Sequence, residues 1–580
     1  MSGLTIDGVD ALRASSVPIA SQVAGSVSSE SFKSTHSKSQ NAGKSMHHHF
    51  SVESQEFTGS ALKKVANKVV PLPFIPLGTG RPSADLYPWE ALSIRTTGPH
   101  TDTPANSQPR ARTASASTSD VADVASESKS CGIANATAAS AASHDLADGS
   151  GSDQISRGRR HPPDSITRYG GGYDLARGLN YSNAAGSQPL VRFFTEHVEI
   201  VHSPPYSNWE TVVTCGSTSA MEMLMRMLCN RGETILTERY TYPGTIEVAA
   251  LLGVKLRGIS MDAGGIIPDE LESALQSWNV TTDGPRPSVL YTIPSGQNPT
   301  GATQTLARKR AIYTLAEKYD LLIIEDDPYY FLRVDTDASP THDSAADPDD
   351  TQRAKTYLAK LTPSYLSIDY SGRVVRLDST SKILAPGLRA GWITACSDII
   401  AKFSSYTEVS TVSVSGPSQL MLWHLLEETW GHVGFFCWLD WLSRRYKRRL
   451  NALVDACERY LPRDLCSWTV PQCGMFLWVA IDLGKHSTFG CPLGTESATD
   501  ATAMLERKRT QLAEIEGRVY ASALRNGTQC TVGSLFDTMP KLDLSLHIRL
   551  TYAAADEQQF EKGVQGLADA LREEFGDRYM

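Results

Sequence analysis

Short apolar runs alternate with amphipathic stretches through the middle of the chain, a pattern typical of alternating strands and helices. The runs that predict strands cover residues 211–214, 234–237, 254–259, 288–292, 321–324, 373–377 and 391–395. Stretches that predict helices lie at 220–228, 245–252 and 304–319. Residues 321–324 are all apolar, as in a parallel strand buried on both faces. We therefore predict an α/β domain over residues 166–432, with a mainly parallel sheet flanked by helices.

The pattern changes near residue 433. A long helix is predicted at 436–460, followed by a strand at 474–480, a helix at 501–526, a strand at 544–550 and a helix at 556–575. This order predicts a smaller C-terminal α+β domain over residues 433–580.

Several segments lack the apolar period of a folded element. Residues 1–56 are rich in Ser and predict a disordered tail, and 57–100 mix apolar and turn residues like an arm docked on a folded surface. Residues 101–165 contain no Phe, Trp or Tyr and predict a disordered insertion. Two further loop insertions are expected at 335–355 and 484–502.

Composition and charge disfavour several kinds of partner and location. The net charge of -9 argues against a nucleic-acid partner. Ten cysteines without a C-x-x-C pair favour a reducing compartment. With no secretory signal and no apolar run of about 20 residues, we expect a cytoplasmic protein without membrane contact. The run His47–His49 offers metal ligands, but solvated histidines in a polar tail are the favoured interpretation, so no metal is predicted.

The stretch around Lys382 has the residues of a cofactor site. Ser379 and Ser381 flank this lysine, and Arg389 follows a Pro-Gly turn. Hydroxyl groups and a guanidinium fork suit a phosphate, and a sheltered lysine can act as an amine nucleophile. A solvated surface lysine in a Ser-rich turn is the alternative.

Other candidates follow the predicted strands. Ser217 and Thr218 begin a helix, where phosphates bind, although such residues are also ordinary caps. Tyr242 can stack on a planar ring or simply pack in the core. Asn298, which precedes Pro299, is well placed to direct its amide at a ligand oxygen.

Two charged positions leave alternatives open. Asp326 lies in an acidic run at the end of an apolar strand, which suits either a metal or a cationic nitrogen. Arg549 lies in an apolar strand and needs an anion, either a substrate carboxylate or an internal salt bridge.

Taken in order, these motifs resemble the fold-type I pyridoxal-phosphate aminotransferases. The resemblance is carried by residues 298–301 (Asn-Pro-Thr-Gly), by Asp326 and Tyr329, by Ser379 to Lys382 with Arg389, and by Arg549. The spellings of residues 323–332 and 474–478 are most similar to the aromatic, 2-aminoadipate and kynurenine branch. The long polar insertions suggest a fungal source. The resemblance covers residues 61–101 and 166 to the C-terminus, apart from the insertions.

The resemblance implies a role for each motif. Lys382 would bind pyridoxal 5'-phosphate covalently and act as the general base, and Asp326 would pair with its ring nitrogen. The remaining cofactor-binding residues would be Ser217, Thr218, Tyr242, Asn298, Tyr329, Ser379, Ser381 and Arg389. The substrate-binding residues would be Gly80, Tyr181 and Arg549. A homodimer with shared sites is also implied.

The resemblance leaves the substrate open. We expect an aromatic amino acid as donor and a 2-oxo acid such as 2-oxoglutarate as acceptor, with 2-aminoadipate or kynurenine as the alternative donor. Where relatives carry an arginine in the arm this chain has Lys63, and Arg81 follows the arm glycine. A carbon–sulfur lyase or decarboxylase would share the cofactor residues. A winged-helix regulator is disfavoured because no basic helix precedes residue 61, and a non-catalytic binding protein is disfavoured by the joint presence of Lys382, Asp326 and Arg549.

Overall fold

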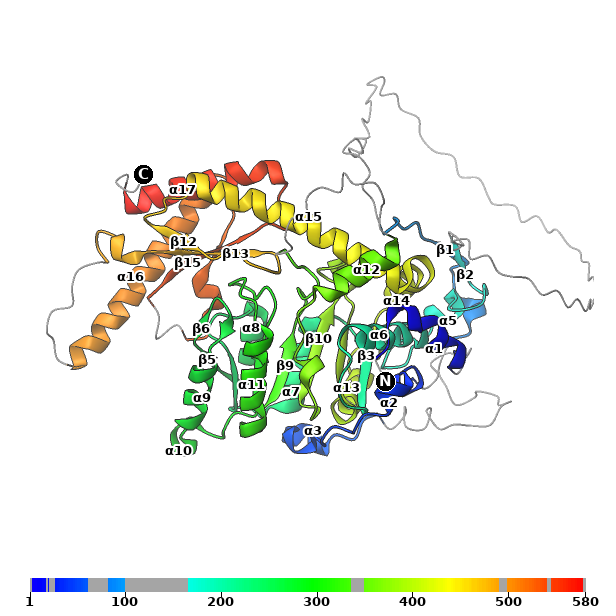
Figure 1. Ribbon diagram of the computed structural model, residues 1–580. Helices are drawn as coiled ribbons and strands as arrows, with labels where there is room; N and C mark the ends of the chain where they lie inside the picture. The colour runs from blue at the N-terminus through cyan, green and yellow to red at the C-terminus, as the bar shows by residue number, and fades with distance from the viewer. Residues whose placement is uncertain are drawn as a thin grey trace, which may run out of the picture. The chain divides into compact units, whose positions relative to one another are not determined.

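The structure is a computed structural model (Figure 1). It describes residues 3–16, 19, 27–60, 82–99, 165–334, 349–489, 498–539 and 544–576. One compact unit comprises Met1–His100 with Pro163–Met580. The second unit, Thr101–Pro162, lies outside the described residues, and so does nearly all of the insertion predicted at 101–165.

Seven strands form the sheet of the large domain, in the order β3-β11-β10-β9-β8-β4-β5. All neighbours are parallel except β11, which runs antiparallel to both β10 and β3. The strands are β3 (Trp209–Thr214), β4 (Thr234–Glu238), β5 (Lys255–Ile259), β8 (Val289–Thr292), β9 (Leu322–Asp326), β10 (Val374–Ser379) and β11 (Gly391–Cys396). The predicted α/β domain with a mainly parallel sheet is confirmed.

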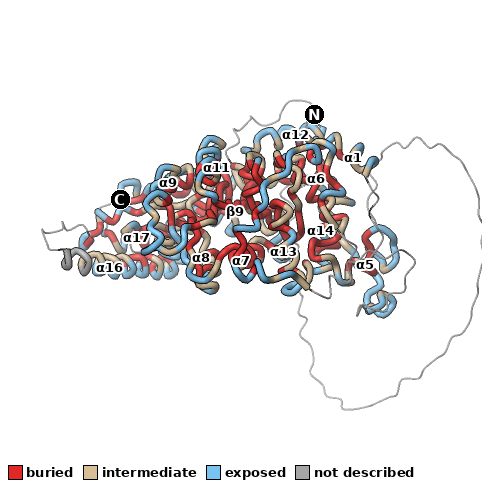
Figure 2. The backbone as a smooth tube through the Cα atoms, turned by 90° about the horizontal axis from the view of Figure 1, so that it is seen from below, coloured by how far each residue is buried: buried red, intermediate tan, exposed pale blue. Residues whose placement is uncertain are grey.

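Helices cover both faces of this sheet. Figure 2 shows α9 and α11 on one side and α7, α8 and α13 on the other, with buried backbone concentrated around β9. The helices of this domain are α5 (Leu175–Gly178), α6 (Gln188–Val201), α7 (Ser217–Leu228), α8 (Pro243–Leu252), α9 (Pro268–Gln276), α10 (Val280–Asp283), α11 (Leu306–Tyr319), α12 (Asp350–Ala359), α13 (Ser397–Val409) and α14 (Gly416–Trp423). A short hairpin joins β6 (Met261–Asp262) to β7 (Gly265–Ile266).

Capping chemistry defines where α11 begins and ends. The Thr305 side chain accepts a hydrogen bond from the Arg308 amide at the first turn. Asp320 ends the helix with φ 53°, and its amide donates to the Ala316 carbonyl. Aspartate tolerates this left-handed conformation better than most residues. The chain then enters β9, all of whose residues are buried, and reaches Asp326 at the carboxyl end of the sheet.

The small domain has an antiparallel sheet in the order β12-β13-β15-β14. Its strands are β12 (Cys466–Trp468), β13 (Phe476–Ile481), β14 (Thr531–Val532) and β15 (Leu546–Thr551). Its helices are α15 (Gly431–Tyr460), α16 (Ala498–Arg525) and α17 (Phe560–Phe575), and a π-helix (His424–Trp430) leads into α15. None of the helices in the described residues combines the length and the apolar character that crossing a bilayer requires.

Two predicted loops are shorter in the structure than in the sequence-based prediction. The loop predicted at 335–355 overlaps α12, which already begins at Asp350, and that predicted at 484–502 overlaps α16, which begins at Ala498. The first residues of α12 are Asp-Thr-Gln-Arg and those of α16 are Ala-Thr-Asp-Ala-Thr, and neither start has large apolar residues with a period from which it could be predicted. Residues 335–348 and 490–497 lie outside the described residues.

The prediction that residues 1–56 are disordered is wrong for the parts that the structure describes. They form α1 (Val9–Ser15), α2 (Thr35–Lys38), α3 (Val52–Glu56) and short 3-10 helices, including His47–His49. Phe32, Met46 and Phe50 are buried in the main hydrophobic core. Serines replace the missing apolar contacts: the Ser29 hydroxyl accepts the Thr211 amide at 2.8 Å. Isolated apolar anchors between serines have no period, so the sequence pattern does not reveal them.

The arm is described only in part. Ala84–Leu86 form a 3-10 helix, and β1 (Ala91–Ser93) pairs with β2 (Ser165–Thr167). Residues 61–81, which include Lys63, Gly80 and Arg81, lie outside the described residues.

Candidate active site

A cavity of about 530 Å³ opens at the carboxyl ends of β8, β9 and β10, where ligands bind in open α/β sheets. Strand β15 of the small domain contributes Arg549 to its wall. The structure brings ten other predicted site residues to this cavity: Ser217, Thr218, Tyr242, Asn298, Asp326, Tyr329, Ser379, Ser381, Lys382 and Arg389.

Lys382 lies in the turn that follows β10 and is half-buried. Burial lowers the pKa of its ammonium group, and the positive charges of Arg549 and Arg389 lower it further. The amine is therefore easier to deprotonate near neutral pH than an ordinary lysine, as a nucleophile or general base requires.

Asp326 lines the cavity and has one carboxylate oxygen without a hydrogen-bond partner. Its Oδ2 accepts a hydrogen bond from the Tyr291 hydroxyl at 2.7 Å, whereas its Oδ1 is buried without a partner. Burial raises the pKa of Asp326 to about 6, although the Tyr291 hydrogen bond partly offsets this effect. A buried carboxylate with an unused oxygen suits a cationic N–H donor.

Arg549 has hydrogen-bonding capacity left unused. Its Nη1 donates to Asn298 Oδ1 at 2.7 Å and its Nη2 to Thr531 Oγ1 at 3.3 Å, but its buried Nε has no partner. The guanidinium lies over the rings of Phe476 and Phe536, 4.3 and 4.8 Å from their centroids. Within the part of the chain that the structure describes, no carboxylate lies in salt-bridge range of it. The alternative of an internal salt bridge is therefore not supported, and Arg549 is free for an incoming anion.

Hydroxyl groups and a guanidinium converge at one corner of the cavity. Ser217 begins α7, and its buried Oγ has no hydrogen-bond partner. Arg389 Nη1 donates to Ser381 Oγ at 3.3 Å. Gly216 has φ 93°, a conformation that other residues rarely adopt, and a Cβ there would lie 2.8 Å from Arg389 Nη2, so a larger residue would displace this guanidinium. The corner offers a helix N-terminus, hydroxyls and a cation, the donor set of a phosphate site.

The sequence of this chain is similar to those of known proteins over most of its length. The aminotransferase class I and II family matches residues 193–567. The aminotransferase swnA of Metarhizium robertsii is 40% identical over 530 residues, which is 91% of this chain and 92% of that protein. The chain belongs to the class I and II aminotransferases. An aromatic amino acid aminotransferase of Schizosaccharomyces pombe (C569.07) is 38% identical over 70% of this chain and 81% of its own length.

A solved structure agrees with this family assignment. The aminotransferase Aro8 of Candida albicans superposes with a TM-score of 0.73 and 30% identity, covering 92% of this chain and all of that chain. The chain is thus a pyridoxal-phosphate-dependent aminotransferase of fold type I. The cavity fits this cofactor, because the unpartnered Asp326 Oδ1 and the phosphate corner provide what its ring nitrogen and its phosphate need.

The acidic run around Asp326 is divided between two environments. Glu325 and Asp327 lie beside the fully buried Arg376, with closest oxygens 3.1 and 3.3 Å from its Nη1. Asp378 binds Arg376 through two hydrogen bonds, of 2.9 and 2.8 Å. Three carboxylates thus surround one guanidinium, and Asp326 alone of the run faces the cavity. The metal-site interpretation of this run is therefore not supported, because an arginine occupies the position that a cation would take.

The aromatic residues of the cavity are held by local packing. Tyr242 precedes the first turn of α8, and a Cβ at Gly244 would lie 2.5 Å from its ring, so this glycine makes room for it. Tyr329 is buried edge-on against Phe476, with ring centroids 5.6 Å apart. Burial raises the pKa of Tyr329, and so does the neighbouring Asp326.

The structure does not place the other two predicted substrate residues at this cavity. Tyr181 is exposed and does not line the cavity, and Gly80 lies outside the described residues. Tyr291, the partner of Asp326, was not predicted from the sequence. Its signal was weak: Tyr291 lies on the strand that pairs with the strand of Asp326, but nothing in the sequence shows that the two strands are neighbours.

Proposed function

We propose that this enzyme transfers the amino group of an aromatic L-amino acid (tryptophan, phenylalanine or tyrosine) to a 2-oxo acid such as 2-oxoglutarate. The observation that carries the proposal is Arg549, a half-buried cation without a carboxylate partner among the described residues, in the cavity that holds Lys382 and Asp326. Met475 and Phe476 line the same cavity and offer apolar surface for a ring. The name of the Schizosaccharomyces relative points to the same donor class.

In this proposal the phosphate corner and the strand ends hold the cofactor. Ser217, Thr218, Ser379, Ser381 and Arg389 bind the phosphate, and Tyr242 stacks on the ring. Pyridoxal phosphate supplies an electron sink for charge that develops at the substrate α-carbon. Asp326 Oδ1 accepts the N–H of the ring nitrogen and keeps that nitrogen protonated.

Asn298 and Tyr329 then act at the ring oxygen. Because Asn298 Oδ1 accepts from Arg549, the amide nitrogen of Asn298 is the group left to donate to the 3'-oxygen of the cofactor. The Tyr329 hydroxyl donates to the same oxygen. Both contacts favour the charged form of that oxygen.

Two basic side chains, Arg549 and Lys382, act on the substrate. Arg549 binds the α-carboxylate with its guanidinium fork and so fixes the α-carbon relative to Lys382. The Lys382 amine would hold the cofactor, and it is the base that would take and return the proton of the substrate α-carbon.

Arg549 does not select among substrate side chains, because every amino acid carries an α-carboxylate. Other residues must therefore make that selection. Arg81 and Lys63 are the residues that would favour 2-aminoadipate, and both lie outside the described residues. If Arg81 points into the cavity, a second carboxylate is favoured, and this is the alternative donor class. Kynurenine belongs to the same alternative.

We also propose a homodimer. Tyr181, assigned to the substrate by family resemblance, is exposed and away from the cavity of its own chain, which suits a residue that completes the site of a second copy. Sedimentation should give a dimer, and a fully active monomer would contradict it. A cytoplasmic location and a fungal source remain predictions of the same proposal.

Steady-state assays of the purified enzyme with a panel of amino acids and 2-oxoglutarate test the substrate. We expect a higher kcat/KM for tryptophan than for 2-aminoadipate, with little change on Arg81→Leu. A clear wild-type preference for 2-aminoadipate that Arg81→Leu removes would reverse the assignment of donor class. Formation of pyruvate and ammonia from a cysteine-type substrate, without amino transfer, would instead indicate a lyase.

A further inference from the structure

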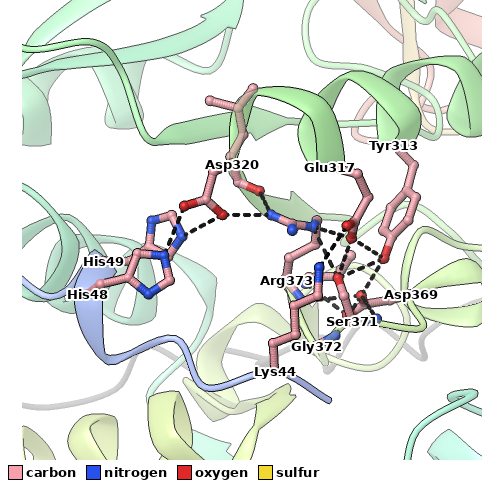
Figure 3. Close-up of polar contacts among 12 residues, drawn as sticks. Lys44, His48, His49, Tyr313, Glu317, Asp320, Asp369, Ser371, Gly372 and Arg373 are labelled. Carbon is pink, nitrogen blue, oxygen red and sulfur yellow. Dashed lines mark hydrogen bonds and ion pairs between the residues drawn. The ribbon is translucent and has the colours of Figure 1, made fainter.

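Two histidines of the N-terminal segment lie beside an aspartate of the large domain that is distant from them in the sequence (Figure 3). His48 Nε2 lies 2.9 Å from Asp320 Oδ2, and His49 Nε2 lies 3.4 Å from Asp320 Oδ1. One donor atom from each of the three side chains falls within 4.8 Å of the others. The rings of His48 and His49 are themselves 4.2 Å apart between centroids.

The cluster contains a buried polar atom that its surroundings do not satisfy. The His49 side chain is only 2% exposed, and its Nε2 has no hydrogen-bond partner although it is directed at Asp320. Burial lowers the pKa of His49 to about 4, so the ring is neutral at pH 7. A neutral imidazole beside a carboxylate is a weak contact, but it is the form in which histidine binds a metal.

The carboxylate is presented from a fixed position. Asp320 ends α11 in the left-handed conformation, so its side chain projects from the corner between α11 and β9 toward the 3-10 helix His47–His49. His48 and Asp320 are each more than half exposed, which leaves a path for an ion from solvent.

We propose that His48, His49 and Asp320 form a binding site for a divalent transition-metal ion of the zinc type. Two imidazoles and one carboxylate are ligands that Zn²⁺ accepts, with water in a fourth position. Ligand atoms around a tetrahedral zinc lie about 3.3 Å apart. The distances of 2.9 and 3.4 Å to the two oxygens of Asp320 are near this value, and the three donor atoms, all within 4.8 Å of one another, would draw closer together around the ion.

A cation already near the site has other partners. Arg373 Nη1 lies 3.4 Å from Asp320 Oδ1 and would be repelled by a metal ion. Its Nε pairs with Glu317 at 2.5 Å, and its Nη1 donates to the Leu321 carbonyl at 2.8 Å, so it remains bound when the Asp320 contact is lost. Lys44 pairs with the other oxygen of Glu317 at 3.1 Å.

The site would fasten the N-terminal segment to the large domain. Asp320 precedes β9, whereas Asp326 lies at the opposite end of that strand in the active site. The ion is thus placed at the edge of the sheet remote from the cofactor, and its role is structural rather than catalytic. Its binding free energy would add to the stability of the docked segment.

Zinc titration of the cofactor-loaded enzyme tests the proposal, with ZnCl₂ alone as the probe and calorimetry and thermal unfolding as the readouts. His48→Ala and Asp320→Asn remove one ligand each, and asparagine tolerates the left-handed conformation at 320. His47→Ala is the matched control, because His47 is the exposed neighbour outside the cluster.

We expect one zinc ion per chain in the wild type and in His47→Ala, with a rise in Tm on adding zinc. Affinity should fall at least tenfold in His48→Ala and Asp320→Asn, since even residues that only support a ligand contribute about 10- to 100-fold. Amino-transfer activity should be unchanged in all three variants. No zinc binding by the wild type at about 100 μM, or equal binding by all variants, would overturn the proposal. So would a loss in His47→Ala as large as that in His48→Ala.

Discussion

Replacing Arg549 by glutamine tests the proposed carboxylate site. The structure gives this guanidinium one hydrogen bond of 2.7 Å, to Asn298, one of 3.3 Å, to Thr531, and an unused Nε. Removing one partner of a buried, hydrogen-bonded charge pair costs about 2 to 5 kcal/mol. At about 1.36 kcal/mol per tenfold, kcat/KM should fall about 30- to 5,000-fold.

The loss should be the same for every amino donor, because the α-carboxylate is common to all of them. Arg549→Lys keeps the charge but loses the fork, so we expect a smaller loss, about tenfold. Arg525→Gln serves as the control, since Arg525 is exposed on α16 and pairs with Glu573, and its kcat/KM should change less than about twofold. Steady-state kinetics with tryptophan and with 2-aminoadipate measure all three. If Arg549→Gln retained its cofactor and a kcat/KM within about threefold of wild type, this role of Arg549 would be refuted.

Three further substitutions probe the cavity and its support. Because burial raises the pKa of Asp326 to about 6, its ionisation destabilises the cofactor-free protein as the pH rises from about 4 to 6. In urea unfolding above pH 6, Asp326→Asn should therefore stabilise the cofactor-free protein by up to about 3 kcal/mol, while it lowers the affinity for the cofactor. Equal stability of the two proteins at pH 7 would contradict this. Gly216→Ala should weaken cofactor binding measurably in absorbance titrations, since its Cβ would crowd Arg389; unchanged affinity would show that the guanidinium can move away. Arg376→Met leaves three buried carboxylates without their cation and should cost about 3 to 5 kcal/mol of unfolding free energy; a loss below 1 kcal/mol would mean that these acids are protonated or hydrated.

Much of the large domain could be predicted from the sequence because most of its strands are buried on both faces. The predicted strand at 321–324 corresponds to β9 (Leu322–Asp326), and the predicted strand at 391–395 to β11 (Gly391–Cys396). The direction of β11, antiparallel within a parallel sheet, depends on contacts between distant segments and has no local signal.

The structure of the N-terminal segment could not be predicted from its composition. Ser-rich residues with isolated apolar side chains look disordered, yet Ser29 and Ser51 are buried and hydrogen-bonded to residues about 180 positions away. Their partners exist only once the large domain has folded. The docking of His49 beside Asp320 could not be predicted for the same reason.

The residues of the candidate site could be predicted from the sequence, but the hydrogen-bond partner of each side chain could not. Motifs placed Lys382 and Asp326 at strand ends and Arg549 within a strand, and the structure brings the three to one cavity. Which partner each polar atom keeps, such as Tyr291 for Asp326, depends on strand register and side-chain direction.

The most direct test of the account is to trap the cofactor on its lysine. The purified protein should be yellow, and reduction with borohydride followed by peptide mass spectrometry should find the pyridoxyl group on Lys382 alone. Lys382→Ala should abolish this adduct and nearly all turnover while the protein remains folded. A stable adduct on a different lysine, or full activity in Lys382→Ala, would contradict the assignment of this cavity as the active site.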